Sequence, residues 1–174
     1  MKMQFTYNIF LIGFMGSGKS TVADYLCEKF DMDVVEMDRV IAERERMSIS
    51  DIFEKHGELY FRDLETKLLV ELQEKTNTVV SCGGGVAMRE CNVTEMKKNG
   101  KVVLLTAKPE TILEREENNH DRPLLENNKT VAYIAELMEK RREKYEAAAD
   151  MIIETDGKSA QKICEEMIQR LGEQ

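Results

Sequence analysis

Short apolar runs alternate along the chain with longer stretches in which hydrophobic residues recur every three or four positions. The short runs have the length of buried strands, and the recurring spacing is typical of helices with one face on a core. Strands that alternate with helices indicate a parallel sheet. The predicted strands are residues 8–12, 33–38, 78–81, 101–106 and 151–153.

Helical spacing accounts for most of the remaining chain. Leu64, Leu68 and Leu72, for example, recur on one face of a predicted helix. The expected fold is α/β, a three-layer α/β/α sandwich around a five-stranded parallel sheet, in a single domain over residues 1–174. The predicted helices are residues 21–30, 39–47, 48–57, 58–72, 89–99, 130–149, one that starts at Pro109, and a closing helix that contains 163–171.

The segment Gly13–Ser20 matches the phosphate-loop pattern G-x-x-x-x-G-K-[ST]. Its glycines allow backbone N–H groups to point at an anion, and a helix that starts near Gly18 adds its positive dipole end. Lys19 is expected to reach the β- and γ-phosphates, and the Ser20 hydroxyl is expected to bind Mg²⁺. A chance glycine-rich turn is the alternative, but the strand before the loop and the helix after it favour nucleotide binding.

Two carboxylates, Glu36 and Asp38, stand at the end of the strand predicted at 33–38. Their i, i+2 spacing lets both project on one side of that strand. Ligands of open parallel sheets bind beyond the carboxyl ends of the strands, so the pair is a candidate Mg²⁺ partner and hydroxyl-binding base. The alternative is a solvated strand end or a helix cap.

Three consecutive glycines, Gly83 to Gly85, follow the strand predicted at 78–81. Such a run loses much backbone entropy on folding, and a plain turn rarely needs three. Bare backbone at a strand end suits the close approach of a ligand, and a flexible turn is the alternative. In the preceding helix, Arg62 and Glu65 are three residues apart and therefore neighbours, as in many weak surface ion pairs.

The polar segment at about 116–128 is broken by Pro123. We interpret it as a lid that carries Arg122 toward the phosphates, with a plain surface loop as the alternative. His120 lies in the same segment and is expected to be a solvated loop residue without metal partners.

The net charge, the cysteine spacing and the length of the first apolar run argue against several classes of function. The net charge of −8 over 174 residues argues against non-specific nucleic-acid binding. The four cysteines are far apart and form no C-x-x-C pair, so neither a disulfide framework nor a zinc site is expected, and a reducing cytoplasm suits the chain. The first apolar run is too short to span a bilayer and leads directly into the phosphate loop, so we expect neither a membrane span nor a signal sequence.

Together these motifs resemble the shikimate kinase family almost from end to end. The phosphate loop alone is shared by many kinases, whereas the glycine triplet, the Phe-Arg pair at Phe61 and the Arg122-Pro-Leu-Leu segment are far more selective. The segments that match, in family order, are 13–21, 36–38, 48–53, 57–62 with Glu65, 81–85, 122–125 and 141–145.

The resemblance implies a fold like that of nucleoside monophosphate kinases, with strand order 2-3-1-4-5. It implies that ATP, with Mg²⁺ as cofactor, phosphorylates the 3-hydroxyl of shikimate on the route to chorismate and the aromatic amino acids. The expected partners are therefore the small molecules shikimate and ATP, without nucleic acid or membrane, and the expected protein is a monomer.

The resemblance also assigns roles residue by residue. Arg62 and Arg141 grip the substrate carboxylate, Glu65 orients Arg62, and Arg115 lies over the adenine opposite the turn at 155–158. The catalytic residues are Lys19, Asp38 and Arg122. The ATP-binding residues are Gly16, Ser17, Gly18, Lys19, Ser20, Thr21, Arg115 and Arg122. The substrate-binding residues are Asp38, Phe53, Phe61, Arg62, Gly83, Gly84, Gly85 and Arg141, and the metal partners are Ser20 and, through a water, Glu36.

One position departs from the family, which usually has Asp-x-Asp where this chain has Glu36-Met-Asp38. Glutamate is one methylene longer, so direct and water-mediated contact with Mg²⁺ both stay open. Two other functions are the alternatives: a kinase of the same fold that acts on gluconate or a nucleoside monophosphate, and a GTP-driven switch. Switch proteins carry an N-K-x-D motif, and Asn128-Lys-Thr-Val131 lacks its aspartate.

Overall fold

The computed structural model describes residues 4–116 and 130–172. Within them, five parallel strands form one sheet in the order β2-β3-β1-β4-β5, which confirms the predicted fold class and strand order. The strands are β1 (Asn8–Ile12), β2 (Asp33–Glu36), β3 (Thr78–Ser81), β4 (Gly100–Thr106) and β5 (Met151–Glu154).

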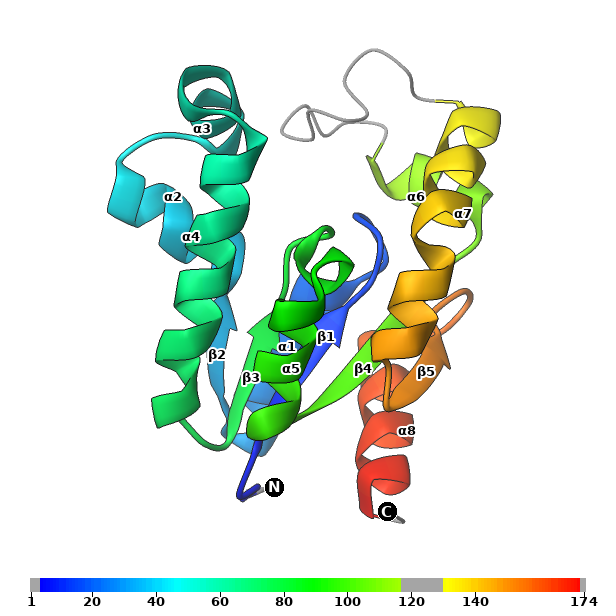
Figure 1. Ribbon diagram of the computed structural model, residues 1–174. Helices are drawn as coiled ribbons and strands as arrows, with labels where there is room; N and C mark the ends of the chain where they lie inside the picture. The colour runs from blue at the N-terminus through cyan, green and yellow to red at the C-terminus, as the bar shows by residue number, and fades with distance from the viewer. Residues whose placement is uncertain (1–3, 117–129, 173–174) are drawn as a thin grey trace.

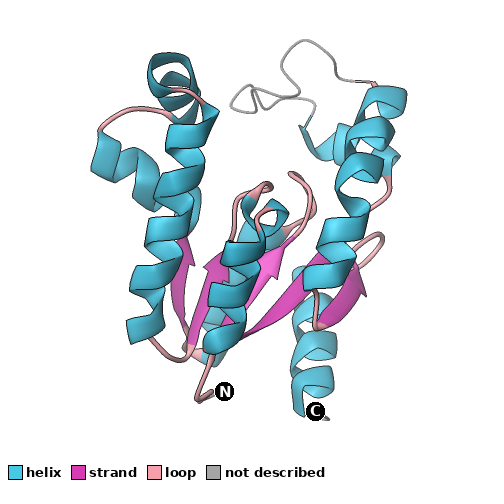
Figure 2. Ribbon diagram, in the orientation of Figure 1, coloured by secondary structure: helices cyan, strands magenta, loops and turns pink. Residues whose placement is uncertain are grey.

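Helices cover both faces of this sheet (Figure 2). Along β1, Ile9 and Leu11 pack with the cluster under α1 and α8, whereas Phe10 and Ile12 pack with the cluster under α4, α5 and α7. Strands buried on both faces in this way are largely apolar, which is why β1 appears in the sequence as an apolar run after Asn8. The helices are α1 (Lys19–Phe30), α2 (Met37–Glu45), α3 (Ile49–His56), α4 (Glu58–Glu71), α5 (Glu90–Lys98), α6 (Pro109–Glu116), α7 (Val131–Ala148) and α8 (Ala160–Gly172).

The strand register places the candidate residues at one edge of the sheet. Leu11 of β1 and Glu36 of β2 both pair with Ser81 of β3, so the three strands end at the same level. The phosphate loop, Glu36 and the glycine triplet therefore emerge side by side at the carboxyl edge, where ligands of such sheets bind.

Most predicted boundaries differ from the structure by one or two residues, but one difference affects the site. The strand predicted to reach Asp38 ends at Glu36, and Asp38 lies in the first turn of α2. The prediction that Glu36 and Asp38 project from the same side of one strand was therefore wrong. A carboxylate in a first helical turn is stabilised by the helix dipole, which favours the earlier helix start.

Two short 3-10 segments were not predicted, η1 (Leu72–Glu74) and η2 (Val86–Met88). Single turns of this kind carry no hydrophobic period that a sequence pattern could detect. Ser48 caps α3, because its Oγ accepts a hydrogen bond from the Asp51 N–H at 3.1 Å. Arg122, His120 and all of the predicted lid except Glu116 lie outside the described residues.

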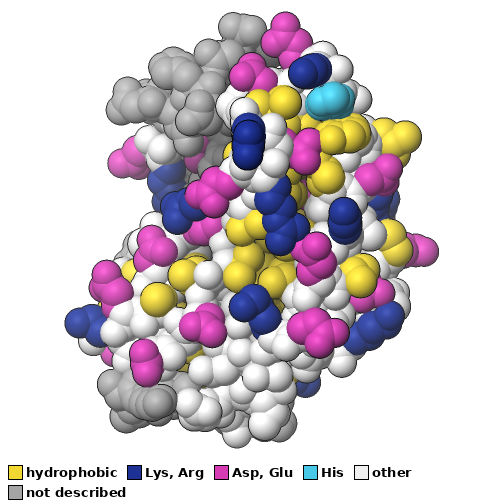
Figure 3. Space-filling model, turned by 90° about the vertical axis from the view of Figure 1, so that its left-hand side faces the viewer, with side chains coloured by type: hydrophobic (Ala, Val, Ile, Leu, Met, Phe, Trp, Pro, Cys, Tyr) yellow, Lys and Arg dark blue, Asp and Glu magenta, His cyan; other side chains and the backbone are white. Residues whose placement is uncertain are grey.

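The face formed by α2, α3 and α4 mixes acidic, basic and apolar side chains (Figure 3).

In the described ranges, no helix is both long and apolar enough to cross a membrane.

Candidate active site

The phosphate loop leaves β1 and winds into α1 through glycines in left-handed conformations. Gly16 has φ 80° and Gly18 has φ 102°, values that side chains disfavour. Gly18 is the N-cap of α1, and the Ser17 N–H donates a hydrogen bond to the Phe14 carbonyl at 3.1 Å. The loop thus has the strained glycine geometry that phosphate cradles need, with a helix N-terminus behind it.

Lys19 extends from the first turn of α1 back across this loop. Its Nζ donates hydrogen bonds to the carbonyl oxygens of Gly13 at 2.6 Å and Phe14 at 3.3 Å. These contacts hold the ammonium group at the rim of the loop, close to where the motif places the β- and γ-phosphates.

A cavity of about 380 Å³ opens beside the loop. The structure brings to it residues from the ends of β1, β2 and β3, as the sequence predicted. Residues lining this cavity include Lys19, Ser20, Glu36, Asp38, Gly83 and Gly84, together with Met15, Arg39, Ser81 and Cys82, which had not been singled out for the site.

The glycine triplet is needed for close approach and not for an unusual backbone conformation, since none of its members has a positive φ. A methyl group at Gly83 would lie 2.9 Å from Asp38 Oδ1 and 2.8 Å from Glu65 Oε2. A methyl group at Gly84 would lie 3.0 Å from Arg141 Nη1, and one at Gly85 would overlap the Arg62 guanidinium. The triplet is therefore the surface on which two carboxylates and two guanidinium groups converge.

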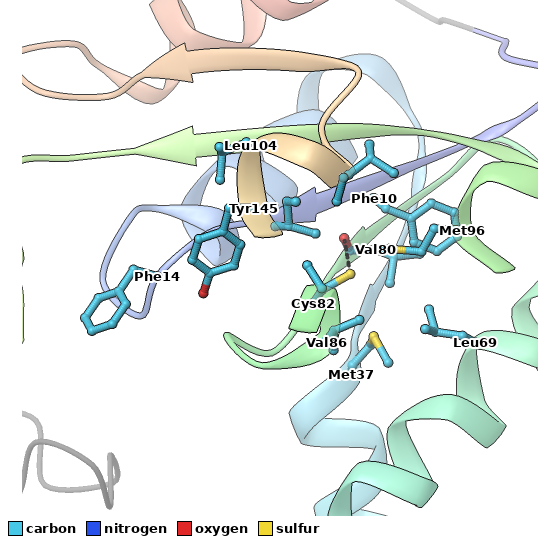
Figure 4. Packing of buried hydrophobic residues seen from close by; sticks show 14 of the residues in the cluster. Phe10, Phe14, Met37, Leu69, Val80, Cys82, Val86, Met96, Leu104 and Tyr145 are labelled. Atoms are coloured by element: carbon cyan, nitrogen blue, oxygen red, sulfur yellow. Dashed lines mark hydrogen bonds between the residues drawn. The ribbon is translucent and has the colours of Figure 1, made fainter. Parts of the chain in front are cut away.

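The triplet is also held in place by hydrogen bonds. The Val86 N–H donates to the Gly83 carbonyl at 3.2 Å, and the Tyr145 hydroxyl donates to the Gly84 carbonyl at 2.5 Å. Tyr145 comes from α7, and Figure 4 shows its ring between Phe14 of the phosphate loop and the strands. The sequence assigned Tyr145 no role of its own in the site, although a buried tyrosine hydroxyl usually needs a partner. The alternative of a flexible turn does not fit these contacts.

The ion pair between Arg62 and Glu65 is far from the weak surface pair that its spacing suggests. Arg62 Nη1 lies 2.8 Å from Glu65 Oε1, and the Glu65 side chain is 0% exposed. Burial raises the pKa of Glu65 to about 7, against the opposing effect of Arg62 and with a smaller contribution from Asp38. Burial acts to lower the pKa of Arg62, but Glu65 and Glu58 outweigh it and raise that pKa.

Aromatic rings support both arginines. Arg62 Cζ lies 5.8 Å from the centroid of the Phe53 ring and 5.3 Å from that of Phe61. Arg141 Cζ lies 5.8 Å from the centroid of the Phe14 ring. Stacking on a ring limits the directions in which a guanidinium can turn, so both groups are oriented before any ligand arrives.

One carboxylate oxygen in the cavity has no partner. Asp38 Oδ1 is buried and accepts no hydrogen bond from any residue that the structure describes. Buried polar atoms are nearly always paired, so this oxygen marks a place where a ligand donor belongs. A hydroxyl group is the simplest donor that fits a site with two nearby cations and bare backbone.

Arg115 lies on the opposite side of the phosphate loop. Its Nη1 donates to the Gly16 carbonyl at 2.8 Å and to Thr155 Oγ1 at 3.3 Å, so Arg115 lies beside the 155–158 turn, and its position over the adenine stays a prediction. The sequence did not single out its neighbour Glu116, whose carboxylate would meet a methyl group at Gly16 at 3.0 Å. Arg115 and Glu116 thus flank one glycine of the loop.

No group of three or more His, Cys, Asp or Glu residues among those described could hold a metal by itself. Ser20 and Glu36, however, line the same cavity and provide a hydroxyl and a carboxylate oxygen. Mg²⁺ in kinases is held by one or two protein oxygens together with substrate phosphates and water, and this donor set fits that arrangement.

Comparisons with known proteins show the family. The family model for shikimate kinase matches residues 15–172. The chain belongs to the shikimate kinase family. The shikimate kinase of Sulfurihydrogenibium sp. (strain YO3AOP1) is 44% identical over 94% of this chain and 97% of its own length. That of Persephonella marina is also 44% identical, over 94% of this chain and 98% of its own length. The chain is accordingly an ATP-dependent kinase of shikimate, as the sequence motifs predicted.

Solved structures agree. The shikimate kinase from Acinetobacter baumannii in complex with shikimate superposes with a TM-score of 0.89 at 33% identity, covering 95% of this chain and 92% of that chain. A gluconokinase from Sinorhizobium meliloti 1021 reaches a TM-score of 0.61 at 18% identity, covering 98% of this chain and 94% of that chain, which shows a shared fold alone.

Proposed function

We propose that this enzyme transfers the γ-phosphoryl group of ATP to the 3-hydroxyl of shikimate, giving shikimate 3-phosphate and ADP for the synthesis of chorismate. The observation that carries the proposal is the convergence of Arg62 and Arg141 on the glycine triplet, next to the unpartnered Asp38 Oδ1. One carboxylate and several hydroxyls are what such a group of cations, acceptor and bare backbone would bind.

In this proposal Arg62 and Arg141 hold the substrate carboxylate. Guanidinium groups bind carboxylates through two parallel hydrogen bonds, so they fix the orientation of the ring as well as its position. Phe53 and Phe61, with ring centroids 5.0 Å apart, would form an apolar wall beneath it. The backbone N–H groups of Gly83–Gly85 would complete the substrate cup.

Asp38 is proposed to hold the attacking hydroxyl and to accept its proton. The hydroxyl oxygen then forms a bond to the γ-phosphorus while the bond to the ADP oxygen breaks. The backbone N–H groups of Gly16–Thr21 hold the phosphates, and Lys19 stabilises charge on the transferred group. Arg122, outside the described residues, is proposed to add a second positive charge there from the predicted lid.

Ser20 and Glu36 are the residues proposed to hold Mg²⁺, with Glu36 acting through a water. When bound, the ion neutralises phosphate charge. Arg115 is proposed to lie over the adenine, because it already bridges the phosphate loop and Thr155. A single-domain monomer in the cytoplasm is part of the same proposal, and all four cysteines are free, as a reducing compartment would keep them.

A substrate panel tests the function. Purified enzyme with Mg·ATP should release ADP with shikimate and show no such turnover with gluconate or CMP. Turnover with gluconate or CMP but not with shikimate would overturn the proposal. Calorimetric titration should also show tighter binding of ATP than of GTP, because the chain lacks the guanine motif of GTP switches.

A further inference from the structure

A second cavity of about 380 Å³ lies between α7 and the edge of the sheet formed by β4 and β5. It shares no lining residue with the cavity that contains Lys19 and Asp38. Its walls include Phe14 of the phosphate loop, Leu104 of β4 and Tyr145 of α7, which Figure 4 shows close together. Ser17 in its lining belongs to the expected ATP-binding residues, but none of the roles proposed for the kinase reaction places a ligand in this space.

The interior of this second cavity is mostly apolar, with Met138 and Ala135 of α7 among its lining residues. Protein interiors are normally packed to crystal-like density, and an apolar space of this size can hold a small organic molecule. The small side chain of Ala135 helps to leave the space open. An apolar residue also lies exposed at its edge, since Ile152 of β5 has 43% of its surface accessible.

One polar atom in these walls is unsatisfied. Ser17 is 1% exposed, and its Oγ has no hydrogen-bond partner in the part of the chain that the structure describes. A buried hydroxyl without a partner is uncommon, because leaving it unpaired is unfavourable by about 1–3 kcal/mol. A ligand in the second cavity that carried one hydrogen-bonding group would satisfy it.

Three charged side chains of α7 form the lip of the second cavity: Glu139, Arg142 and Glu146. Arg142 lies between two carboxylates on the same helix, with Nε 3.1 Å from Glu139 Oε2 and Nη1 3.0 Å from Glu146 Oε2. The single guanidinium is therefore already paired twice, and the three side chains together are negative. An anionic ligand would have to displace one of these carboxylates and face the other.

We propose that the second cavity is a binding site for a compact, uncharged and mostly apolar molecule with one hydroxyl group. The apolar walls exclude strongly hydrated ligands, the lip excludes anions, and Ser17 provides a partner for the hydroxyl. The proposal concerns binding at a site separate from the shikimate pocket, and it does not depend on how that pocket works.

The test uses p-cresol as the probe and protein labelled with ¹³C at the methionine methyl groups. The Met138 methyl resonance, assigned with the Met138→Leu variant, should shift on titration and reach saturation. Ala135→Leu should fill the space and weaken p-cresol binding about tenfold or more, which corresponds to the transfer free energy of the displaced ring. Ala132→Leu places the same side chain on an exposed position of the same helix and should leave binding unchanged.

Two further probes test the chemistry. Toluene, which lacks the hydroxyl, should bind several-fold more weakly than p-cresol, and benzoate should cause no saturable shift. If Ala135→Leu fails to fold by circular dichroism, Ala135→Val takes its place, with an expected loss of roughly threefold. A Met138 shift that does not saturate, equal binding to the Ala135 and Ala132 variants, or tightest binding of benzoate would overturn the proposal.

Discussion

The carboxylate of Glu58 holds the outer edge of the Arg62 guanidinium. Its Oε2 accepts hydrogen bonds from Arg62 Nη2 at 3.1 Å and from Nε at 3.2 Å, while the buried Glu65 takes Nη1. The edge of Arg62 formed by Nε and Nη2 is therefore occupied by a residue of the same helix, which must leave before a substrate carboxylate can bind there. Glu58 is 65% exposed, so it can swing into solvent when a ligand arrives.

Glu58→Gln should strengthen substrate binding. Removing this charge leaves Arg62 oriented by Glu65 but takes away the competitor for its outer edge. We expect the KM for shikimate to fall about two- to fivefold, in line with the modest energy of an exposed ion pair, with kcat unchanged. Steady-state kinetics measures both constants. A higher KM would mean that Glu58 orients Arg62 and does not compete with the substrate.

Arg62→Ala should weaken shikimate binding far more than ATP binding. Two charge-assisted hydrogen bonds to a carboxylate are lost, which corresponds to about a hundredfold rise in the KM for shikimate. The KM for ATP should change less than about twofold, because Arg62 faces the glycine triplet and not the phosphate loop. Arg44→Ala, on an exposed arginine paired with Glu71, serves as the control. Equal losses for both ligands would contradict the assigned role.

Lys19→Met should reduce turnover about a hundred- to a thousandfold, the range seen when one charge-stabilising donor is removed. The melting temperature should stay close to that of the unchanged protein, since methionine keeps most of the aliphatic stem. Coupled ADP release and thermal unfolding measure the two quantities, with Lys67→Met on the exposed face of α4 as the control. A variant that kept most of its rate would exclude Lys19 from the mechanism.

Glu65→Gln should change how stability depends on pH. The pKa of Glu65 is raised from 4.5 to about 7 in the folded protein, so between these values the unfolded chain binds fewer protons. The contribution of this group to stability is therefore present below about pH 4.5 and is lost as the pH rises through about 7. Relative to the glutamine variant, the original protein should lose roughly 2–3 kcal/mol between about pH 5 and about pH 8. Urea unfolding at both pH values measures this, and parallel curves for the two proteins would contradict it.

Asn92→Ala should weaken shikimate binding, although Asn92 is not among the residues proposed to bind the substrate. Asn92 is fully buried, donates from Nδ2 to the Val86 carbonyl at 2.9 Å and accepts from Thr66 Oγ1 at 2.7 Å. It thereby ties η2, just after the glycine triplet, to the helix that carries Arg62. We expect a loss of about 1–3 kcal/mol in stability and a rise in the KM for shikimate without a matching rise for ATP. Equal changes in both KM values would indicate a purely structural role.

Local pattern was enough to predict much of this protein. The strands, helices and phosphate loop depend on side-chain period and on glycine conformation, which neighbouring residues alone decide. The edge of the sheet at which the candidate residues gather was predictable as well, because the carboxyl ends of parallel strands lie on the same side of a sheet. The resemblance to shikimate kinases rested on short motifs of the same local kind.

Contacts between distant segments decided the rest. The burial of Glu65, and with it a pKa near 7, depends on residues packed around the helix and not on the three-residue spacing to Arg62. The Tyr145 bond to Gly84 joins positions 61 residues apart, and the position of Asp38 depends on where β2 gives way to α2. The second cavity lies between α7 and the strands β4 and β5, and the sequence of each element taken separately does not predict it. Pattern in a sequence reports which face of an element is buried, whereas burial depth, partners and empty space exist only once the elements pack.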